Sequence, residues 1–357
     1  MYLRPTRAPA PSVSECRFAG QLVPATSQPG DAPTPGSETG AVPTAESTPL
    51  SAERSWRFGF GLATDADPGL WAQSLGAGWY LDWSATARPT DLEVEHWPMV
   101  RVAPDCMRPT PEEAAVLAGQ RPGQTWIIGN EPDVIWQDNL TPEAYAAAYH
   151  AYYAAIKGAD PSALFAVAGV AQPTPLRLAY LDRVLTTYQQ TYGQTMPVDV
   201  WTVHNFVLRE ERGSWGAEIP PGFDDVTTGR LAEVGDHARI DLFEAQLREF
   251  RDWMAQRGYR NAPLALTEFG ILMPAEYGFP SEAVAAYLSL TMDLLSTLAD
   301  PATGYPPDGN RLVQRWAWFS LSDPLFPASN LADLTLGQLT EVGRAFRLSM
   351  ERSGSDP

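Results

Sequence analysis

Short apolar runs alternate with amphipathic stretches from Trp56 to the end of the chain. The apolar runs end in polar or turn-forming residues, which is typical of buried parallel strands. The longer stretches between them repeat apolar residues at every third or fourth position, as helices do. This alternation predicts repeated β/α units. The predicted strands are 57–63, 78–83, 99–103, 125–130, 164–170, 198–205, 264–268 and 313–320.

Eight such strands over about 300 residues predict an α/β protein with a (β/α)8 TIM barrel. Helices are predicted at 141–156, 237–258, 280–298 and 340–350. In the first of them, Thr141 is a suitable N-cap and Pro142 a suitable first residue. Its apolar stripe, which we expect to pack in the core, consists of Tyr145, Tyr149, Tyr152 and Ile156.

Residues 1–52 are rich in Pro, Ser, Thr, Ala and Gly, and this composition predicts a disordered tail or linker. We expect the barrel domain at 53–351 and a flexible C-terminus at 352–357. Tails of this kind commonly join an export signal or anchor to an extracellular domain, so we expect an extracellular or cell-surface protein. The first eleven residues contain no signal-peptide core, and an intracellular floppy terminus remains the alternative.

The composition limits the possible partners. A net charge of −18 disfavours binding to nucleic acid or to an anionic membrane, and a neutral ligand fits better. No apolar run is long enough to span a membrane. Cys16 and Cys106 are too few for a disulfide framework, and Cys106 is expected to be a small buried residue. The four histidines lack metal-site spacing, so we expect no metal.

Two carboxylates follow predicted strands. Glu131 lies in Gly-Asn-Glu-Pro after the fourth strand, and Glu268 lies in Thr-Glu-Phe-Gly at the end of the seventh. The carboxyl ends of all barrel strands meet on one face, so the two side chains can converge there. Glycosidic bond cleavage needs one carboxylic acid to protonate the leaving oxygen and one carboxylate to attack or activate water. The pair therefore predicts a glycosidase.

These motifs resemble those of clan A retaining glycoside hydrolases, and the resemblance covers residues 56 to about 350. It implies that Glu131 is the acid/base, that Glu268 is the nucleophile, and that Asn130 binds the sugar 2-hydroxyl. His204 matches the histidine of a His-x-Tyr motif on the sixth strand, but Phe206 replaces the tyrosine. Families 5, 39 and 128 remain open, and no cofactor is needed.

Aromatic residues near strand ends are candidate sugar platforms, because a pyranose stacks on an indole ring. We predict this role for Trp318, which shares a face of the eighth strand with Trp316. Trp83 and Trp136 remain open between substrate binding and packing. We also expect Arg101 to pair either with Glu268, keeping it ionised, or with Asp105. The loop 208–236 is long enough to shape a substrate cleft.

The sequence thus predicts a monomeric retaining hydrolase of β-linked, β-glucan-type glycans. As nucleophile, Glu268 is expected to have a normal or lowered pKa. A carbohydrate-binding barrel without turnover is the alternative, although both glutamates are present. A metal-assisted barrel enzyme is weaker still, since among the histidines only His204 lies at a suitable strand end.

Overall fold

A computed structural model describes residues 55–353. It contains a strand at each of the eight predicted places, so the TIM-barrel prediction is confirmed. Most of the strands are shorter than predicted, and the remaining residues of each predicted range lie in loops. The barrel strands are β1 (Ser55–Gly61), β2 (Ala77–Leu81), β4 (Met99–Ala103), β6 (Thr125–Ile128), β7 (Leu164–Val167), β8 (Trp201–His204), β9 (Leu264–Phe269) and β10 (Arg315–Trp318).

The strands close into a ring of parallel neighbours. β1 pairs with both β2 and β10, and β10 continues through β9 to β8. β4 pairs with β6, and β6 with β7. A parallel bridge between Ala166 and Val200 joins β7 to the start of β8. On the other side, β3 (Glu95–His96) pairs with β2 and runs through Trp97 and Pro98 into β4.

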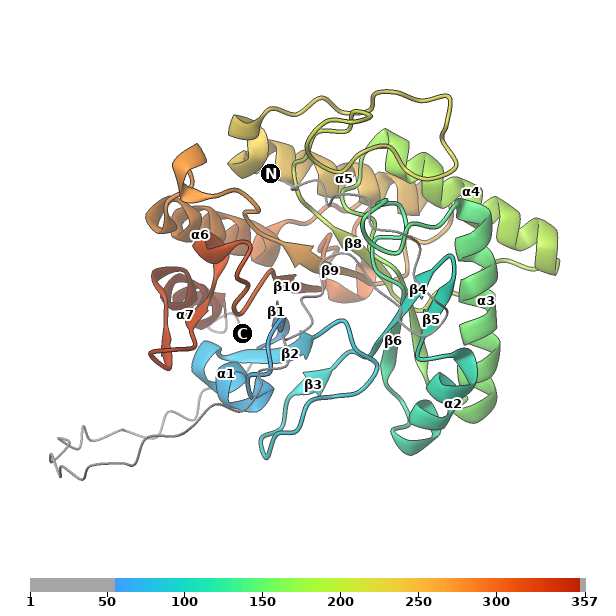
Figure 1. Ribbon diagram of the computed structural model, residues 1–357, viewed down its shortest axis with the longest axis horizontal. Helices are drawn as coiled ribbons and strands as arrows, with labels where there is room; N and C mark the ends of the chain where they lie inside the picture. The colour runs from blue at the N-terminus through green and yellow to red at the C-terminus, as the bar shows by residue number, and fades with distance from the viewer. Residues whose placement is uncertain (1–54, 354–357) are drawn as a thin grey trace, which may run out of the picture.

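Helices surround this ring in Figure 1, and they connect its strands in the β/α order. In the described chain the connection from β2 to β4 is the exception, since it has β3 and no helix. The α-helices are α1 (Pro68–Leu75), α2 (Pro111–Gln120), α3 (Pro142–Ala159), α4 (Pro175–Tyr192), α5 (Ile240–Gln256), α6 (Ser281–Thr297) and α7 (Glu341–Ser353). The Thr141 side chain caps α3 as predicted, and its predicted aromatic stripe is buried.

The apolar core has two layers. The outer layer lies between the strands and the helices, and the inner layer fills the barrel. The inner layer combines large rings from the β2–β3 side with small side chains from the opposite strands. Its residues are Trp79, Leu81, Trp97, Met99, Ile127, Ala166, Val200, Ala265 and Ala317, with Trp83 packed against them.

The remaining elements are short. They are β5 (Cys106–Arg108), β11 (Ala332–Asp333) and β12 (Gln338–Leu339), with 3-10 turns at Val234–Ala238, Ala275–Tyr277, Pro306–Asp308 and Pro327–Ser329. The loop 208–236 is fixed to the barrel through Arg177 of α4, which is fully buried and pairs with Asp133 and Glu210. No helix within 55–353 has the length and apolarity needed to cross a membrane.

The expectation for Cys106 is wrong. It is half-buried in the β4–β5 hairpin and is disulfide-bonded, so it is not a small side chain within the core. The sequence has one other cysteine, Cys16, which lies outside the described residues. The predicted disordered tail at 1–52 also lies outside them, as does most of the predicted flexible C-terminus.

Candidate active site

Glu131 is presented by a turn that follows β6. Gly129 and Glu131 both have positive φ angles, of 95° and 43°. A positive φ costs little at glycine but is unfavourable at glutamate, where it is usually found only if the surroundings enforce it. Here the Glu131 N–H donates to the carbonyl of Gly169 at 3.1 Å, which ties the turn to the end of β7.

Asp138 also fixes this turn through hydrogen bonds to backbone N–H groups. Its carboxylate is fully buried and accepts from the N–H of Asn130 at 2.7 Å and of Val102 at 3.1 Å. It also pairs with Arg101 at 2.7 Å. Arg101 is therefore bound to Asp138 rather than to Glu268 or Asp105, although its charge lowers the pKa of Glu268. Asp138 has no motif around it that would have identified this role in the sequence.

Glu268 owes its position to a bulge in β9. Leu266 pairs with Trp316 and Phe269 with Trp318, so three steps along β9 match two along β10. The pairing with β8 shifts at the same point. A bulge of this kind adds a residue to one strand and redirects a side chain. Leu266 and Phe269 both lie in the outer core. The extra residue between them allows the Glu268 side chain to point toward His204.

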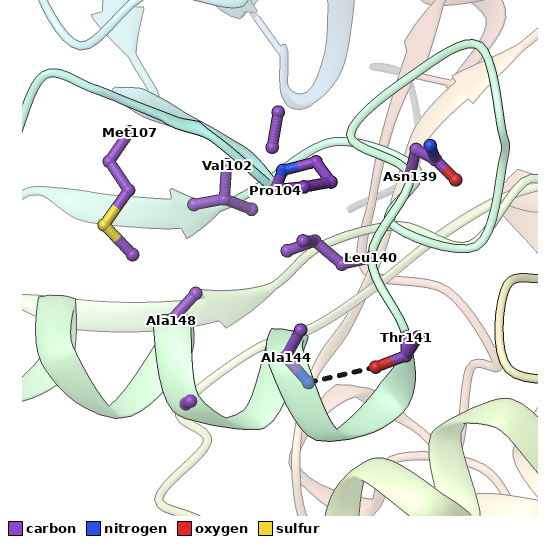
Figure 2. A pocket seen from close by; sticks show the side chains of 10 residues that line it. Val102, Pro104, Met107, Asn139, Leu140, Thr141, Ala144 and Ala148 are labelled. Carbon is purple, nitrogen blue, oxygen red and sulfur yellow. Dashed lines mark hydrogen bonds between the residues drawn. The ribbon is translucent and has the colours of Figure 1, made fainter.

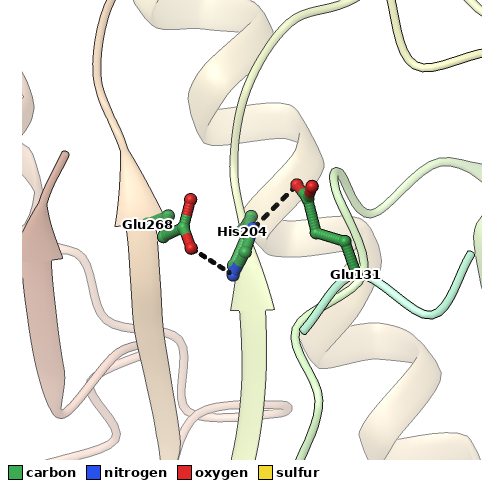
Figure 3. A group of neighbouring side chains, drawn as sticks. All are labelled: Glu131, His204 and Glu268. Carbon is green, nitrogen blue, oxygen red and sulfur yellow. Dashed lines mark hydrogen bonds and ion pairs between the residues drawn. The ribbon is translucent and has the colours of Figure 1, made fainter. Parts of the chain in front are cut away.

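His204 lies between the two glutamates (Figure 3). Its Nδ1 is 2.9 Å from Oε1 of Glu131, and its Nε2 is 3.5 Å from Oε1 of Glu268. One carboxylate oxygen from each glutamate and a ring nitrogen lie within 4.8 Å of one another. Trp83 completes the arrangement, because its Nε1 donates to Oε1 of Glu268 at 2.8 Å.

Burial controls the charges in this group. It raises the pKa of Glu268 to about 7; the charge of Glu131 adds to this effect, while His204 and the Trp83 hydrogen bond oppose it. The expectation of a normal or lowered pKa for Glu268 is wrong for this reason. Burial alone would lower the pKa of His204, but the charge of Glu268 and the bond to Glu131 raise it above its usual value. The imidazole therefore holds its proton more strongly than a free histidine side chain does.

Two neighbours fix the plane of the His204 ring. Gly169 leaves no room on one side, since a Cβ there would lie 2.5 Å from Cδ2 of His204 and 2.8 Å from Nε2. Phe206 packs edge-on against the ring, with the centroids 6.2 Å apart. Where the resembled family has a tyrosine, this chain thus has an apolar contact. Sequence reasoning had not identified Gly169.

Several buried polar atoms near the carboxylates have no hydrogen-bond partner within the described residues. They include Oδ1 of Asn130, Oγ1 of Thr267 and Oγ of Ser320. Buried polar atoms are usually paired, and leaving them unpaired is costly. A hydroxyl group is a suitable partner for such atoms, because it both donates and accepts.

The structure contradicts the prediction for Trp318. Its ring is fully buried, it packs against Phe269 and Tyr287, and its Nε1 donates to the carbonyl of Ser329 at 2.8 Å. It offers no face to a sugar. Trp316 and Trp318 do share a face, but that face points to the outer core. Trp136 is half-buried against the same core, and its role in substrate binding stays a prediction.

Glu131, His204 and Glu268 are close enough together to hold a metal ion. However, each ring nitrogen of His204 already faces one of the carboxylates, and the pKa of His204 is raised by its bond to Glu131 and the charge of Glu268. A metal ligand must instead be the neutral imidazole. The arrangement therefore fits a shared proton better than a cation.

Comparison with known proteins agrees with this geometry. Residues 59–213 match the family model described as glycosyl hydrolase catalytic core. Over these residues the sequence resembles a glycoside hydrolase catalytic core. The predicted resemblance to TIM-barrel glycoside hydrolases is thereby confirmed. The match includes Glu131 and His204 and ends before Glu268.

Solved structures of family 128 glycoside hydrolases have the same fold. An endo-β-1,3-glucanase of subgroup I from Amycolatopsis mediterranei, in complex with laminaritriose, is 19% identical with a TM-score of 0.56, over 83% of this chain and 100% of that one. A subgroup II endo-β-1,3-glucanase from Pseudomonas viridiflava is 19% identical with a TM-score of 0.55, over 82% and 96%. A subgroup III curdlan-specific exo-β-1,3-glucanase from Blastomyces gilchristii has the same identity and TM-score, over 82% and 97%. No curated protein matches the sequence.

Proposed function

We propose that this glycoside hydrolase core cleaves β-1,3-glucan by a retaining double displacement, with Glu268 as nucleophile and Glu131 as acid/base. The observation that carries the proposal is the distance between the two carboxylates, whose oxygens lie within 4.8 Å of each other. Retaining enzymes have carboxyl groups roughly 5–5.5 Å apart, whereas inverting enzymes need about 6.5–9.5 Å to leave room for water.

In the first step, the carboxylate of Glu268 attacks the anomeric carbon while Glu131 gives its proton to the leaving glycosidic oxygen. One C–O bond forms to Glu268 and one breaks to the leaving sugar, which departs as an alcohol. In the second step, water attacks the anomeric carbon, Glu131 takes a proton from that water, and Glu268 leaves as a carboxylate. The two inversions together retain the anomeric configuration.

His204 and Trp83 have complementary roles in this sequence. An imidazolium beside Glu268 stabilises the carboxylate that must attack, and the indole N–H of Trp83 does the same at 2.8 Å. As the covalent bond forms, the charge on Glu268 disappears. His204 then remains bonded to Glu131, which is the general base of the second step.

The substrate class is supported by the structural relatives. They are endo- or exo-β-1,3-glucanases, and one of them is bound to laminaritriose. The net charge of −18 suits a neutral polysaccharide, because an acidic glycan would be repelled. Asn130 supplies an unpaired buried Oδ1 for a sugar hydroxyl.

The test is hydrolysis of laminarin, curdlan and other β-glucans, mannans and xylans by the wild type and by Glu268→Gln and Glu131→Gln. We expect turnover of the β-1,3-glucans by the wild type and a loss of at least 1000-fold for Glu268→Gln, since removal of a nucleophile leaves little catalysis. NMR of the first-formed product should show the β-anomer. An α-anomer would refute retention, and full turnover by Glu268→Gln would refute the nucleophile. Binding of laminari-oligosaccharides without turnover by the wild type would identify a binding protein.

We further propose that the protein acts as a monomer outside the cell. A disulfide at Cys106 favours an oxidising compartment, because thiols are kept reduced in most cytosols. Light scattering of the purified protein should give the mass of one chain. Fractionation of the producing cells should place the protein in the medium or at the cell surface, and a purely cytosolic protein would contradict this assignment.

A further inference from the structure

A cavity of about 460 Å³ lies outside the barrel, between the β4–β5 hairpin and the start of α3. In Figure 2, Val102 and Pro104 of the hairpin face Ala144 and Ala148 of the helix across it. Met107 and Leu140 close two further sides. The walls are thus almost entirely aliphatic, and the cavity is distinct from the group formed by the two glutamates and His204.

The chemistry of these walls does not suit a sugar. No aromatic side chain lines the cavity to stack on a pyranose, and the only polar side chains that line it are those of Asn139 and Thr141. The Thr141 oxygen already accepts from the N–H of Ala144 as the N-cap of α3. An apolar side chain would fit better, because burying it here would remove apolar surface from water on both sides.

The disulfide at Cys106 indicates which segment could supply that side chain. Met107 lines the cavity and pairs with Val102, so Cys106 is next to the rim. The sequence contains one other cysteine, Cys16. Apolar residues follow it within 17–23, namely Phe18, Ala19, Leu22 and Val23. Phe18 is two residues from Cys16, about 7 Å of extended chain, which is within reach of the cavity.

We propose that residues 17–23 dock into this cavity, with Phe18 as the anchor, and that a disulfide between Cys16 and Cys106 tethers them there. Forming the bond removes two protons and two electrons from the two thiols. Oxidised glutathione accepts these two protons and two electrons and becomes two molecules of reduced glutathione. Docking brings the two sulfur atoms together, so it raises the tendency of the disulfide to form.

The test is a redox titration of the full chain with mixtures of reduced and oxidised glutathione, in which the fraction of disulfide gives an equilibrium constant. We expect Phe18→Ala to lower this constant about 10- to 100-fold, the factor that corresponds to burial of one phenylalanine side chain. Tyr2→Ala is the matched control, because Tyr2 is the only other aromatic residue within 1–52, and it should leave the constant unchanged.

A second variant tests the cavity itself. Ala148→Leu fills part of the space, and it should lower the constant in the wild type but have little further effect in the Phe18→Ala background. Thermal unfolding confirms that each variant is folded. Equal constants for Phe18→Ala and Tyr2→Ala would overturn the proposal. So would a disulfide between two chains, seen as a dimer on a non-reducing gel. If Ala148→Leu loses laminari-oligosaccharide binding while its equilibrium constant for disulfide formation is unchanged, the cavity is a sugar subsite and the docking proposal is wrong.

Discussion

Replacing His204 by glutamine should shift the pH dependence of catalysis. The imidazole is fully buried and lies 3.5 Å from Glu268, whose pKa it lowers. Glutamine keeps a hydrogen-bonding side chain but carries no charge. Without the imidazolium, burial and the charge of Glu131 would be opposed only by the Trp83 hydrogen bond and the charge of Arg101, so the pKa of Glu268 should rise above its wild-type value of about 7.

The size of the shift follows from the distance. Two unit charges 3.5 Å apart interact by about 5 kcal/mol at an effective dielectric constant of about 20, which corresponds to roughly 3 pH units. Measured effects of one opposite charge on an acid are about 1–3 pH units. The acid limb of kcat/KM, which the pKa of Glu268 predicts near pH 7 in the wild type, should therefore move up by that amount. At pH 6 the variant should be at least about tenfold less active.

The assay is the pH profile of kcat/KM on a soluble β-1,3-glucan. His150→Gln is the matched control, because His150 lies on α3 and bonds Tyr188 at 2.8 Å, outside the site. Its profile should equal that of the wild type. If His204→Gln lowers activity equally at all pH values and leaves the acid limb in place, His204 only holds the shape of the site. A limb displaced to lower pH would refute the electrostatic reasoning altogether.

Three further substitutions test the surroundings of the two glutamates. The Cβ added by Gly169→Ala would displace the His204 ring, so we expect kcat to fall about 10- to 100-fold with KM little changed. The control is Gly158→Ala, whose Cβ meets nothing within 4 Å and which should be neutral. Trp83→Phe removes the hydrogen bond to Glu268 and should raise the acid limb by about 1–2 pH units, with a lower kcat/KM; an unmoved limb would contradict this. Asp138→Ala removes the buried carboxylate that pairs with Arg101 and accepts from two N–H groups, so it should cost about 3–5 kcal/mol in urea unfolding. A change below about 1 kcal/mol would show that the turn is stable without this carboxylate.

The fold could be predicted because parallel barrel strands leave a strong signal. Each strand is buried on both sides, so it reads as an apolar run whose end is marked by polar residues. Counting these runs placed Glu131 and Glu268 after the fourth and seventh strands, where the structure has them. Helix positions followed from caps and apolar stripes, as with Thr141 at the start of α3.

The direction in which side chains point at the strand ends could not be predicted, because it depends on details of the backbone that have no sequence signature. The bulge in β9 shifts the register by one residue, and the motif Thr-Glu-Phe-Gly does not indicate a bulge. Trp318 shows the same limit. Alternation put Trp316 and Trp318 on one face correctly, but it could not say whether that face is the inner one. Ala317, the residue between them, proves to be the one that points into the barrel.

The space available for side chains inside the barrel links the packing of the core to the position of Glu268. At each of three glycines, the missing side chain makes room for a ring from another part of the barrel. A Cβ would lie 2.4 Å from Trp79 at Gly59, 2.9 Å from Trp83 at Gly61 and 2.5 Å from His204 at Gly169. Two of these rings, Trp83 and His204, face Glu268 directly. A close-packed barrel cannot admit two rings beside a buried carboxylate unless neighbouring strands give up their side chains. The glycines therefore help to set the position of Glu268, and a search of the sequence for acids and rings alone would not find Gly61 or Gly169.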